Sequence, residues 1–180
     1  MTKILFICHG NICRSPMAEF IMKDMVKKAG LEKEFLIESA ATSREELGNP
    51  VYPPARRKLA EHGICCSGKT ARQLQNHDYE QFDLLIGMDS RNLRNMQRIL
   101  SAPSAVLRTV ALRDGACGRS CGGDFSDKMR LLLDDTDRPG DVADPWYTGD
   151  FEATWRDVEA GCRGLLNDLI KGGAARYGTK

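Results

Sequence analysis

Residues 8–15, "CHGNICRS", bring together side chains that can bind an anion and attack it. Cys8 supplies a nucleophilic sulfur, and Arg14 supplies a planar guanidinium that can hold two oxygens of a phosphate. Gly10 and Asn11 tolerate the left-handed backbone that a loop needs to turn its amides inward. The spacing therefore predicts a phosphate-binding loop with a nucleophile at its base. The predicted members of this loop are His9, Gly10, Asn11, Ile12, Cys13, Arg14 and Ser15.

The sequence on both sides of this loop predicts where it lies in a fold. Residues 3–7 are a short apolar run typical of a buried strand, and apolar residues recur at helical spacing over 17–26. Ser15 is a good N-cap for that helix, and Pro16 suits its first position. Parallel sheets collect ligands between a strand end and a helix N-terminus, where the helix dipole favours an anion. We therefore expect Cys8 to be held as a thiolate.

The remaining sequence continues this alternation of apolar runs, which predict strands, and amphipathic segments, which predict helices. The expected later strands are 35–40, 82–89 and 129–133, and the expected later helices are 53–62, 90–100 and one from 151 onward. This order is typical of an α/β fold, in which a parallel sheet is flanked by helices on both faces. Residues 101–127 fit no element and are interpreted as a possible extra loop.

The composition argues against several classes of protein. The 180 residues carry a formal net charge of +1, so neither a nucleic acid nor an anionic membrane is expected as a partner. No apolar run approaches the roughly 20 residues that a membrane span needs. The N-terminus lacks the pattern of a signal peptide, from which a cytoplasmic location is expected.

The seven cysteines do not indicate a disulfide-bonded secreted protein or a zinc site. Their number is odd, and a hydrophobic content of 42% is enough for a core without cross-links. The closely spaced pairs downstream are Cys65–Cys66 and Cys117–Cys121, and no histidine accompanies either pair at the spacing of a zinc motif. No bound metal is therefore expected.

The loop resembles the active-site loop of the low-molecular-weight protein tyrosine phosphatases, C-x-G-N-x-C-R-S, and every fixed position of that pattern is present. A second segment of that family, aspartate followed by proline and an aromatic residue, is matched at residues 144–147, "DPWY". The similarity extends through "SAATS", "ARRKLAEHGI", "TARQ" and "LLIGMDSRNL". It implies a single phosphatase domain over residues 1–180 with four parallel strands. The implied substrates are phosphotyrosine-containing proteins or peptides, and the implied state is a monomer or weak dimer.

The resemblance also implies a mechanism that the residue types support. Cys8 attacks the phosphorus of a phosphate monoester to give a phosphocysteine, while Arg14 and the loop amides hold the equatorial oxygens. Asp144 is the expected general acid for the leaving phenol and the base for the attacking water. Ser15 is expected to hydrogen-bond the Cys8 sulfur, and Asn11 to stiffen the loop. This mechanism needs no metal or other cofactor.

Several of these residues also have a purely structural interpretation. Asp144 fits an Asp-Pro turn, and Asp89, which the resemblance implies as a polar support of the loop, fits a helix cap equally well. Trp146 and Tyr147 fit packing residues as well as walls of a substrate pocket. The sequence leaves both interpretations open at these positions.

The substrate is expected to be phosphotyrosine because Ile12, Trp146 and Tyr147 make an apolar slot suited to a phenyl ring. Related phosphatases that act on phosphoarginine carry a small polar residue at the position of Ile12. Eukaryotic members often have a tryptophan near the position of Glu45, where this chain carries a charge. Tyr52 is expected to compensate as a pocket wall.

Cys13 is a candidate redox partner of Cys8, because a thiolate is easily oxidised and a neighbouring thiol can trap the first oxidation product. We predict that peroxide produces a Cys8–Cys13 disulfide. The alternative is that Cys13 is a small packed residue with no such role.

Three other activities fit parts of the sequence less well. Arsenate reductases share this fold and loop but relay electrons through a distal cysteine pair, whereas Cys117 and Cys121 lie in the surplus segment. A cysteine phosphocarrier would not need Asp144 to protonate a leaving group. Residues 63–70, "GICCSGKT", match the nucleotide-binding P-loop pattern, but a charged amphipathic helix precedes them instead of the required strand.

Overall fold

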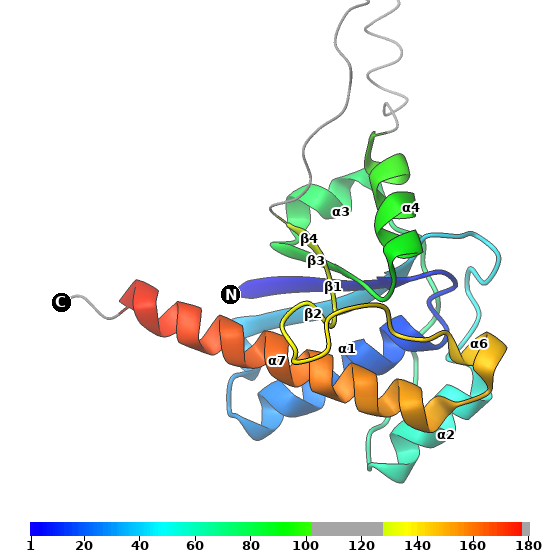
Figure 1. Ribbon diagram of the computed structural model, residues 1–180, viewed down its shortest axis with the longest axis horizontal. Coiled ribbons are helices and arrows are strands. Elements are labelled where there is room, and N and C mark those ends of the chain that lie inside the picture. The colour runs from blue at the N-terminus through cyan, green and yellow to red at the C-terminus, as the bar shows by residue number, and fades with distance from the viewer. Residues whose placement is uncertain (102–127, 178–180) are drawn as a thin grey trace, which may run out of the picture.

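The computed structural model describes residues 1–101 and 128–177, which form a sheet covered by helices on both faces (Figure 1). The strands follow the spatial order β2-β1-β3-β4, and each pairing is parallel. This arrangement confirms the four-stranded α/β fold expected from the sequence. The strands are β1 (Thr2–Cys8), β2 (Phe35–Ala41), β3 (Leu84–Gly87) and β4 (Met129–Leu131).

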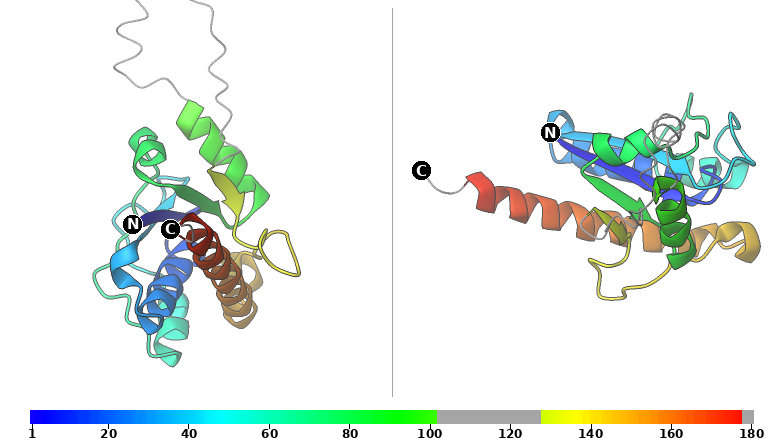
Figure 2. Two further views of the ribbon diagram at one scale, coloured as in Figure 1. Left: turned by 90° about the vertical axis from the view of Figure 1, so that its left-hand side faces the viewer. Right: turned by 90° about the horizontal axis from the view of Figure 1, so that it is seen from above.

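Helices lie on both faces of this sheet. In chain order they are α1 (Arg14–Lys28), the 3₁₀ helix η1 (Glu32–Glu34), α2 (Pro53–Glu61), α3 (Asn76–Gln81), α4 (Ser90–Ser101), α6 (Pro145–Thr148) and α7 (Phe151–Tyr177). Figures 1 and 2 show α1, α2 and α7 on one face and α3 and α4 on the other. None of the helices in the described ranges is long and apolar enough to cross a bilayer.

Side chains of the central strand β1 alternate between these two faces and join two apolar clusters. Phe6 packs in the cluster that includes Met17 of α1 and Val158 of α7. Ile7, the next residue, packs instead with Met96 of α4. All five side chains are fully buried, as expected for a parallel sheet covered on both faces. Because β1 is packed on both faces, the position of its last residue, Cys8, is fixed.

The carboxyl end of β1 is the point at which the strand order reverses. Cys8 lies beside Ala41, the last residue of β2, while β3 pairs with the opposite side of β1. Beyond the strands, the backbone N–H of Thr42 donates to Cys8 O at 2.9 Å. Open α/β sheets bind ligands in the crevice outside such a switch point, and the predicted phosphate-binding loop begins there.

Two glycines of α7 let the segment after β4 lie directly against that helix. A Cβ atom on Gly161 would lie 2.5 Å from the side chain of Leu132, and one on Gly164 would lie 2.5 Å from the carbonyl oxygen of Asp135. Both distances are shorter than any van der Waals contact. This close packing fixes the segment that leads to Asp144.

The structure shortens two expected strands and adds a helix. The N–H of Phe82 donates to Asp78 O and closes α3, which the sequence did not predict, so β3 begins only at Leu84. At the other end, the Asp89 carboxylate accepts from the N–H of Asn92 at 2.6 Å and starts α4. Local hydrogen bonds to the backbone carbonyl of Asp78 and to the side chain of Asp89 therefore override the apolar pattern of 82–89.

The remaining differences lie in the second half of the chain. β4 ends at Leu131 because the Asp134 carboxylate accepts from the N–H of that residue at 2.8 Å and turns the backbone. The segment between β4 and α7, in which the sequence predicted no helix, contains the short helix α6. Apart from Ser101, the possible extra loop at 101–127, with Cys117 and Cys121, lies outside the described residues.

Candidate active site

The loop after β1 curls around the Cys8 sulfur. The backbone N–H of Asn11 donates to Cys8 Sγ at 3.3 Å. Asn11 has a φ of 58° and is the one non-glycine residue with positive φ in the part of the chain that the structure describes. Asparagine is one of the few residues that tolerate this conformation, so the sequence expectation for this position agrees with the backbone.

The side chain of Asn11 is fully hydrogen-bonded and holds the loop in this shape. Its Nδ2 donates to Ser15 Oγ at 2.9 Å and to Ser39 Oγ at 2.7 Å. Its Oδ1 accepts from the backbone N–H of Arg72 at 3.2 Å. Asn11 is completely buried, so these bonds offset the cost of its strained backbone and of its desolvated amide.

Ser15 lies beside the sulfur, but its expected role as an N-cap is wrong. Helix α1 begins at Arg14, so Cys13 occupies the N-cap position without a side-chain hydrogen bond. Ser15 is therefore inside the first turn, and its Oγ lies 3.0 Å from Cys8 Sγ. A hydroxyl that is not used for capping is available to donate to the sulfur.

Arg14 joins three segments of the chain behind the loop. Its Nη1 donates to Asp89 Oδ2 at 2.6 Å and to Val142 O at 3.1 Å, and its Nη2 donates to Asp144 Oδ2 at 2.5 Å. Burial alone would lower the pKa of Arg14, but the charges of Cys8, Asp144 and Asp89 raise it above the usual value. The guanidinium is therefore held as a fixed cation beside the loop.

Asp144 and Asp89 each carry out the structural role that the sequence left open, and each also contacts Arg14. Asp144 is the N-cap of α6, since its Oδ1 accepts from the N–H of Trp146 at 3.1 Å. Asp89 caps α4 through Asn92. In both cases one carboxylate oxygen accepts from the backbone and the other accepts from Arg14. The cap fixes the orientation of the carboxylate toward the guanidinium.

Aromatic rings stand on one side of the loop. The ring centroids of Tyr52 and Trp146 are 5.1 Å apart, and those of Tyr52 and Phe151 are 6.1 Å apart. Ile12 belongs to the same cluster and is 8% exposed. Trp146 is 55% exposed, so its ring retains a free face. The structure thus brings Ile12, Tyr52 and Trp146 together as the sequence predicted.

Tyr147 and Phe151 differ from expectation. Tyr147 is 80% exposed, and within the described ranges no aromatic ring packs against it. Phe151, the first residue of the expected last helix, was not predicted as a site residue, yet its ring packs against Tyr52. Its position seven residues after Asp144 is the sequence signal that could have assigned it to the site.

Acidic side chains lie at the exposed edge of the loop. The predicted pocket residue Glu45 is hydrogen-bonded to His9 of the loop. Glu45 Oε2 accepts from His9 Nε2 at 3.0 Å. A Cβ atom on Gly10 would lie 3.2 Å from Glu46 Cγ, so glycine lets the 43–48 segment approach the loop. Gly10 has no positive φ, so the left-handed backbone expected for it is wrong, and its small size serves this close approach instead.

Cys13 is buried and packs against Ile12 and Ala71. Its burial, together with the negative charges of Cys8 and Asp144, raises the pKa of the Cys13 thiol well above its usual range. Cys8 and Cys13 are both free in the structure. The packing role is therefore present, and the predicted disulfide with Cys8 stays a prediction.

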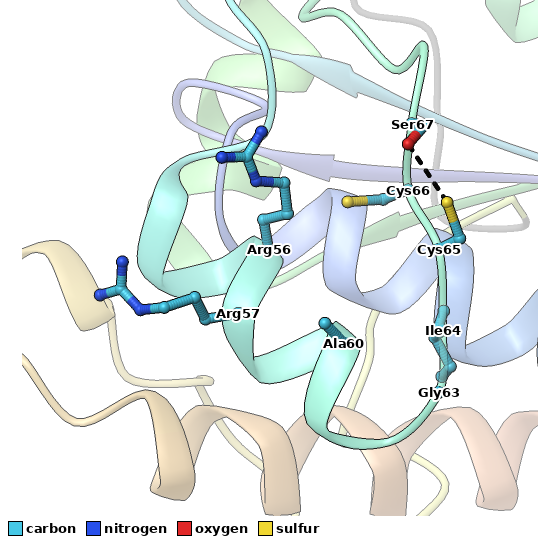
Figure 3. A pocket seen from close by; sticks show the side chains of 8 residues that line it. All are labelled: Arg56, Arg57, Ala60, Gly63, Ile64, Cys65, Cys66 and Ser67. Atoms are coloured by element: carbon cyan, nitrogen blue, oxygen red, sulfur yellow. Dashed lines mark hydrogen bonds between the residues drawn. The ribbon is translucent and has the colours of Figure 1, made fainter.

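A hollow of about 410 Å³ lies away from this loop, between α2 and residues 63–67 (Figure 3). It contains part of the "GICCSGKT" motif. Gly63 follows α2 with a φ of 73°, and Lys69 donates to Ser39 O at 3.1 Å. The motif thus follows a helix and its lysine is already bonded within the protein, and both features argue against a nucleotide site.

Several residues that support the loop were not found from sequence. They are Glu19, Ser39, Lys69, the backbone N–H of Arg72 and the carbonyl of Val142. Backbone groups carry no residue-type signal at all. Glu19 had one signal, because it is the one charged residue in the otherwise apolar run 16–22, "PMAEFIM".

A doubly wound sheet with a cysteine at the end of β1 and an arginine at the start of α1 is typical of α/β proteins that bind an anion at the switch point. Residues 3–114 match the family model described as Low molecular weight phosphotyrosine protein phosphatase. The chain belongs to this family, which confirms the resemblance seen in its motifs. In the part of the chain that the structure describes, no three His, Cys, Asp or Glu side chains are grouped to hold a metal.

Individual relatives agree with this assignment. The low molecular weight protein-tyrosine-phosphatase YfkJ of Bacillus subtilis is 36% identical over 174 residues, which cover 95% of this chain and 97% of the relative. The crystal structure of YfkJ matches with a TM-score of 0.78 at 32% identity and covers 96% of both chains. The crystal structure of DARP, a Drosophila arginine phosphatase, matches with a TM-score of 0.72 at 25% identity and covers 93% of this chain and 98% of the other.

Proposed function

We propose that this protein hydrolyses phosphotyrosine monoesters in proteins or peptides through a phosphocysteine intermediate, without a metal ion or other cofactor. The observation that carries the proposal is the environment of the Cys8 sulfur. The N–H of Asn11 is directed at Sγ over 3.3 Å, and Ser15 Oγ lies 3.0 Å from it at the start of α1. Hydrogen bonds and a helix N-terminus stabilise a thiolate, the form that acts as a nucleophile.

In the first step, the Cys8 thiolate attacks phosphorus and the bond to the phenolic oxygen breaks. Arg14 and the loop amides stabilise the charge on the equatorial oxygens, since they are fixed before the reaction begins. Asp144, in its protonated form, gives its proton to the leaving phenolate. The products of this step are the phenol, the phosphocysteine and the Asp144 carboxylate.

In the second step, a water molecule attacks the phosphocysteine. The Asp144 carboxylate takes a proton from that water, inorganic phosphate is formed and the sulfur leaves as a thiolate. The Ser15 hydroxyl, 3.0 Å from Sγ, stabilises the charge that returns to the sulfur. The cycle restores both the thiolate and the protonated acid.

The aromatic side chains support phosphotyrosine as the substrate. Tyr52 and Trp146 stand beside the loop with a ring separation of 5.1 Å, and Ile12 packs in the same cluster. Stacked and edge-on contacts between rings stabilise an aromatic ligand beyond simple burial. A phenyl ring whose phosphate occupies the loop would extend along this wall.

Phosphoarginine is the second candidate substrate, because the family likeness includes an arginine phosphatase. Membership of the family supports phosphate-ester hydrolysis and does not by itself separate these two substrates. We propose phosphotyrosine because Ile12, not a small polar residue, lies in the loop. Measuring kcat/KM for a phosphotyrosyl and a phosphoarginyl peptide of the same sequence decides between them.

We further propose that the chain is a single phosphatase domain. It is proposed to act in the cytoplasm as a monomer or weak dimer. The cysteines in the described ranges are all free thiols, which suits a reducing compartment. A structural disulfide in the protein isolated under non-reducing conditions would contradict this location.

The function is tested by measuring phosphate release from a phosphotyrosyl peptide by the wild type and by Cys8→Ser. We expect turnover by the wild type without added metal and none by the variant, because a hydroxyl at this position is not ionised. Acid quenching during turnover should trap a phosphorylated Cys8. Stable phosphocysteine without phosphate release would indicate a phosphocarrier, and arsenate-dependent oxidation of thioredoxin would indicate a reductase.

A further inference from the structure

A buried carboxylate, Glu19, lies just beyond the loop on α1 and has no part in the chemistry described so far. It is 3% exposed. Its Oε1 accepts from Lys23 Nζ at 2.5 Å, and its Oε2 accepts from Ser39 Oγ at 2.5 Å and lies 2.9 Å from Lys69 Nζ. Burial would raise the pKa of Glu19, but the two lysines and Ser39 lower it below the usual value. Glu19 is therefore a buried anion.

Hydrogen bonds connect this anion to the Cys8 sulfur. The single hydrogen of the Ser39 hydroxyl is donated to Glu19, so Ser39 Oγ can only accept, and it accepts from Asn11 Nδ2 at 2.7 Å. The second hydrogen of that amide goes to Ser15 Oγ at 2.9 Å. The Ser15 hydroxyl hydrogen then has two acceptors, Cys8 Sγ at 3.0 Å and the carbonyl oxygen of Ala40 at 3.4 Å, of which the sulfur is the nearer. The charge of Glu19 thus sets the direction of donation along the whole chain.

Lys69 is the more buried of the two lysines that keep Glu19 ionised. It comes from the "GICCSGKT" segment, whose match to a nucleotide-binding motif the fold does not support. Its side chain is 12% exposed, and Nζ contacts both Glu19 and the carbonyl oxygen of Ser39. A buried carboxylate without its cation would become protonated or force a rearrangement. One ammonium group therefore ties the loop after α2 to both α1 and β2.

We propose that Glu19 and Lys69 are positioning residues for the nucleophile. Their ion pair holds Ser39 as an acceptor, which orients Asn11 and Ser15 so that both donate toward the Cys8 sulfur. This inference rests on the proposed function, because it assumes that Cys8 is the reacting group. Neither residue touches the substrate.

A merely structural role would also place an ion pair at this position, so the test must separate positioning from stability. In Lys69→Met, Glu19 loses its more buried cation and keeps only the partly exposed Lys23, so both roles are disturbed. In the double variant Glu19→Met/Lys69→Met, both buried charges are removed and the unpaired Lys23 is partly exposed to solvent, and apolar replacement of a buried ion pair is often neutral for folding. The double variant still lacks the acceptor for Ser39.

The experiment compares four proteins with the wild type: Lys69→Met, the double variant, Lys69→Arg and Lys58→Met. Lys58 pairs with Glu61 and Glu152 on the surface and serves as the matched control. For each protein we measure the thermal unfolding midpoint, kcat and KM with p-nitrophenyl phosphate, and the rate at which iodoacetate alkylates Cys8 at a fixed pH.

We expect the double variant to recover the unfolding midpoint but to keep a kcat about tenfold below wild type, with slower alkylation of Cys8. Lys69→Arg should restore most of the activity, and Lys58→Met should match wild type. A double variant with wild-type kcat and alkylation rate would overturn the inference. If the wild type releases no phosphate, the proposed function fails, while the alkylation rates still decide whether Glu19 and Lys69 position the sulfur.

Discussion

Arg14 Nη2 and Asp144 Oδ2 lie 2.5 Å apart, so the proposed phosphate-binding residue and the proposed general acid are joined directly. Asp89 is bonded to the same guanidinium at 2.6 Å. The carboxyl group that would give the proton in the first step is thus held beside the cation that would bind the phosphate.

This relationship predicts the behaviour of Asp144→Asn. An amide cannot give a proton to the leaving oxygen, so kcat should fall by about 10²- to 10⁴-fold with a phosphotyrosyl peptide. The loss should be smaller with p-nitrophenyl phosphate, because its phenolate leaves without protonation. The measurement is kcat for both substrates.

Asp141→Asn is the control for this variant. Asp141 lies on the same segment and accepts from Ser90, with no bond to Arg14. Its kcat should stay close to that of the wild type. An equal loss for both substrates in Asp144→Asn would argue that Asp144 positions Arg14 and does not transfer the proton.

Asn11 allows the backbone and side-chain contributions to the loop to be separated. Both Asn11→Gly and Asn11→Ala lose the bonds to Ser15, Ser39 and Arg72, so both should be less stable and less active than wild type. Only alanine is strained at a φ of 58°. The free energy of unfolding of Asn11→Ala should therefore be about 1 kcal/mol lower than that of Asn11→Gly.

Urea unfolding of the two Asn11 variants provides this comparison, with activity measured in parallel. Equal stability of the glycine and alanine variants would mean that the loop relaxes away from positive φ once the side-chain bonds are gone. In that case the side chain, and not the tolerance of asparagine for this backbone, would be the reason for the residue.

The sequence predicted those parts of the site whose residue types carry their own chemistry. Cys8, Arg14 and Asn11 lie in one short segment whose spacing follows from the strand and helix around it. The fold class was predictable for the same reason, since apolar runs and amphipathic segments alternate regularly. In both cases the information is local.

The unpredicted parts depend on contacts between segments far apart in the chain. Val142 contributes only a carbonyl oxygen to Arg14, and Arg72 contributes only an N–H to Asn11. Ser15 was assigned as an N-cap because serine is common there, but the loop starts the helix at Arg14 and leaves the hydroxyl for the sulfur. Here the geometry of the loop, and not the preference of serine for N-cap positions, decides where the helix begins.

Oxidation by peroxide should convert Cys8 and Cys13 to a disulfide. Peroxide first oxidises the Cys8 thiolate to a sulfenic acid, and Cys13 then displaces water from it to form the S–S bond. Only the thiolate of Cys13 attacks efficiently, and its burial raises the pKa of that thiol well above the usual range. Disulfide formation should therefore become faster as the pH rises, over the whole range in which the protein is folded.

Mass spectrometry after peroxide treatment at several pH values measures this reaction. Cys13→Ala should accumulate sulfinic and sulfonic acid at Cys8, and a reductant should restore activity to the wild type alone. Cys65→Ala is the control, because Cys65 is exposed and lies outside the loop. Overoxidised Cys8 beside a free Cys13 in the wild type would contradict the prediction.

Gly164 should be intolerant of any side chain, because it lets the segment leading to Asp144 pack on α7. An alanine Cβ there would lie 2.5 Å from the carbonyl oxygen of Asp135, which is backbone and cannot rotate away. Gly164→Ala should therefore lower the free energy of unfolding by about 1–3 kcal/mol. Because the displaced segment carries Val142 and Asp144, kcat should fall as well.

Gly172 of the same helix is the matched control, since a Cβ there would meet nothing within 4 Å. Alanine has the higher helix propensity, so Gly172→Ala should raise the free energy of unfolding by up to about 1 kcal/mol and leave kcat unchanged. Urea unfolding and p-nitrophenyl phosphate hydrolysis of the two variants give both quantities. If Gly164→Ala lost stability but kept its kcat, the position of Asp144 would not depend on the contact between α7 and Asp135. The cap of α6 and the bond to Arg14 would then suffice to hold the general acid in place.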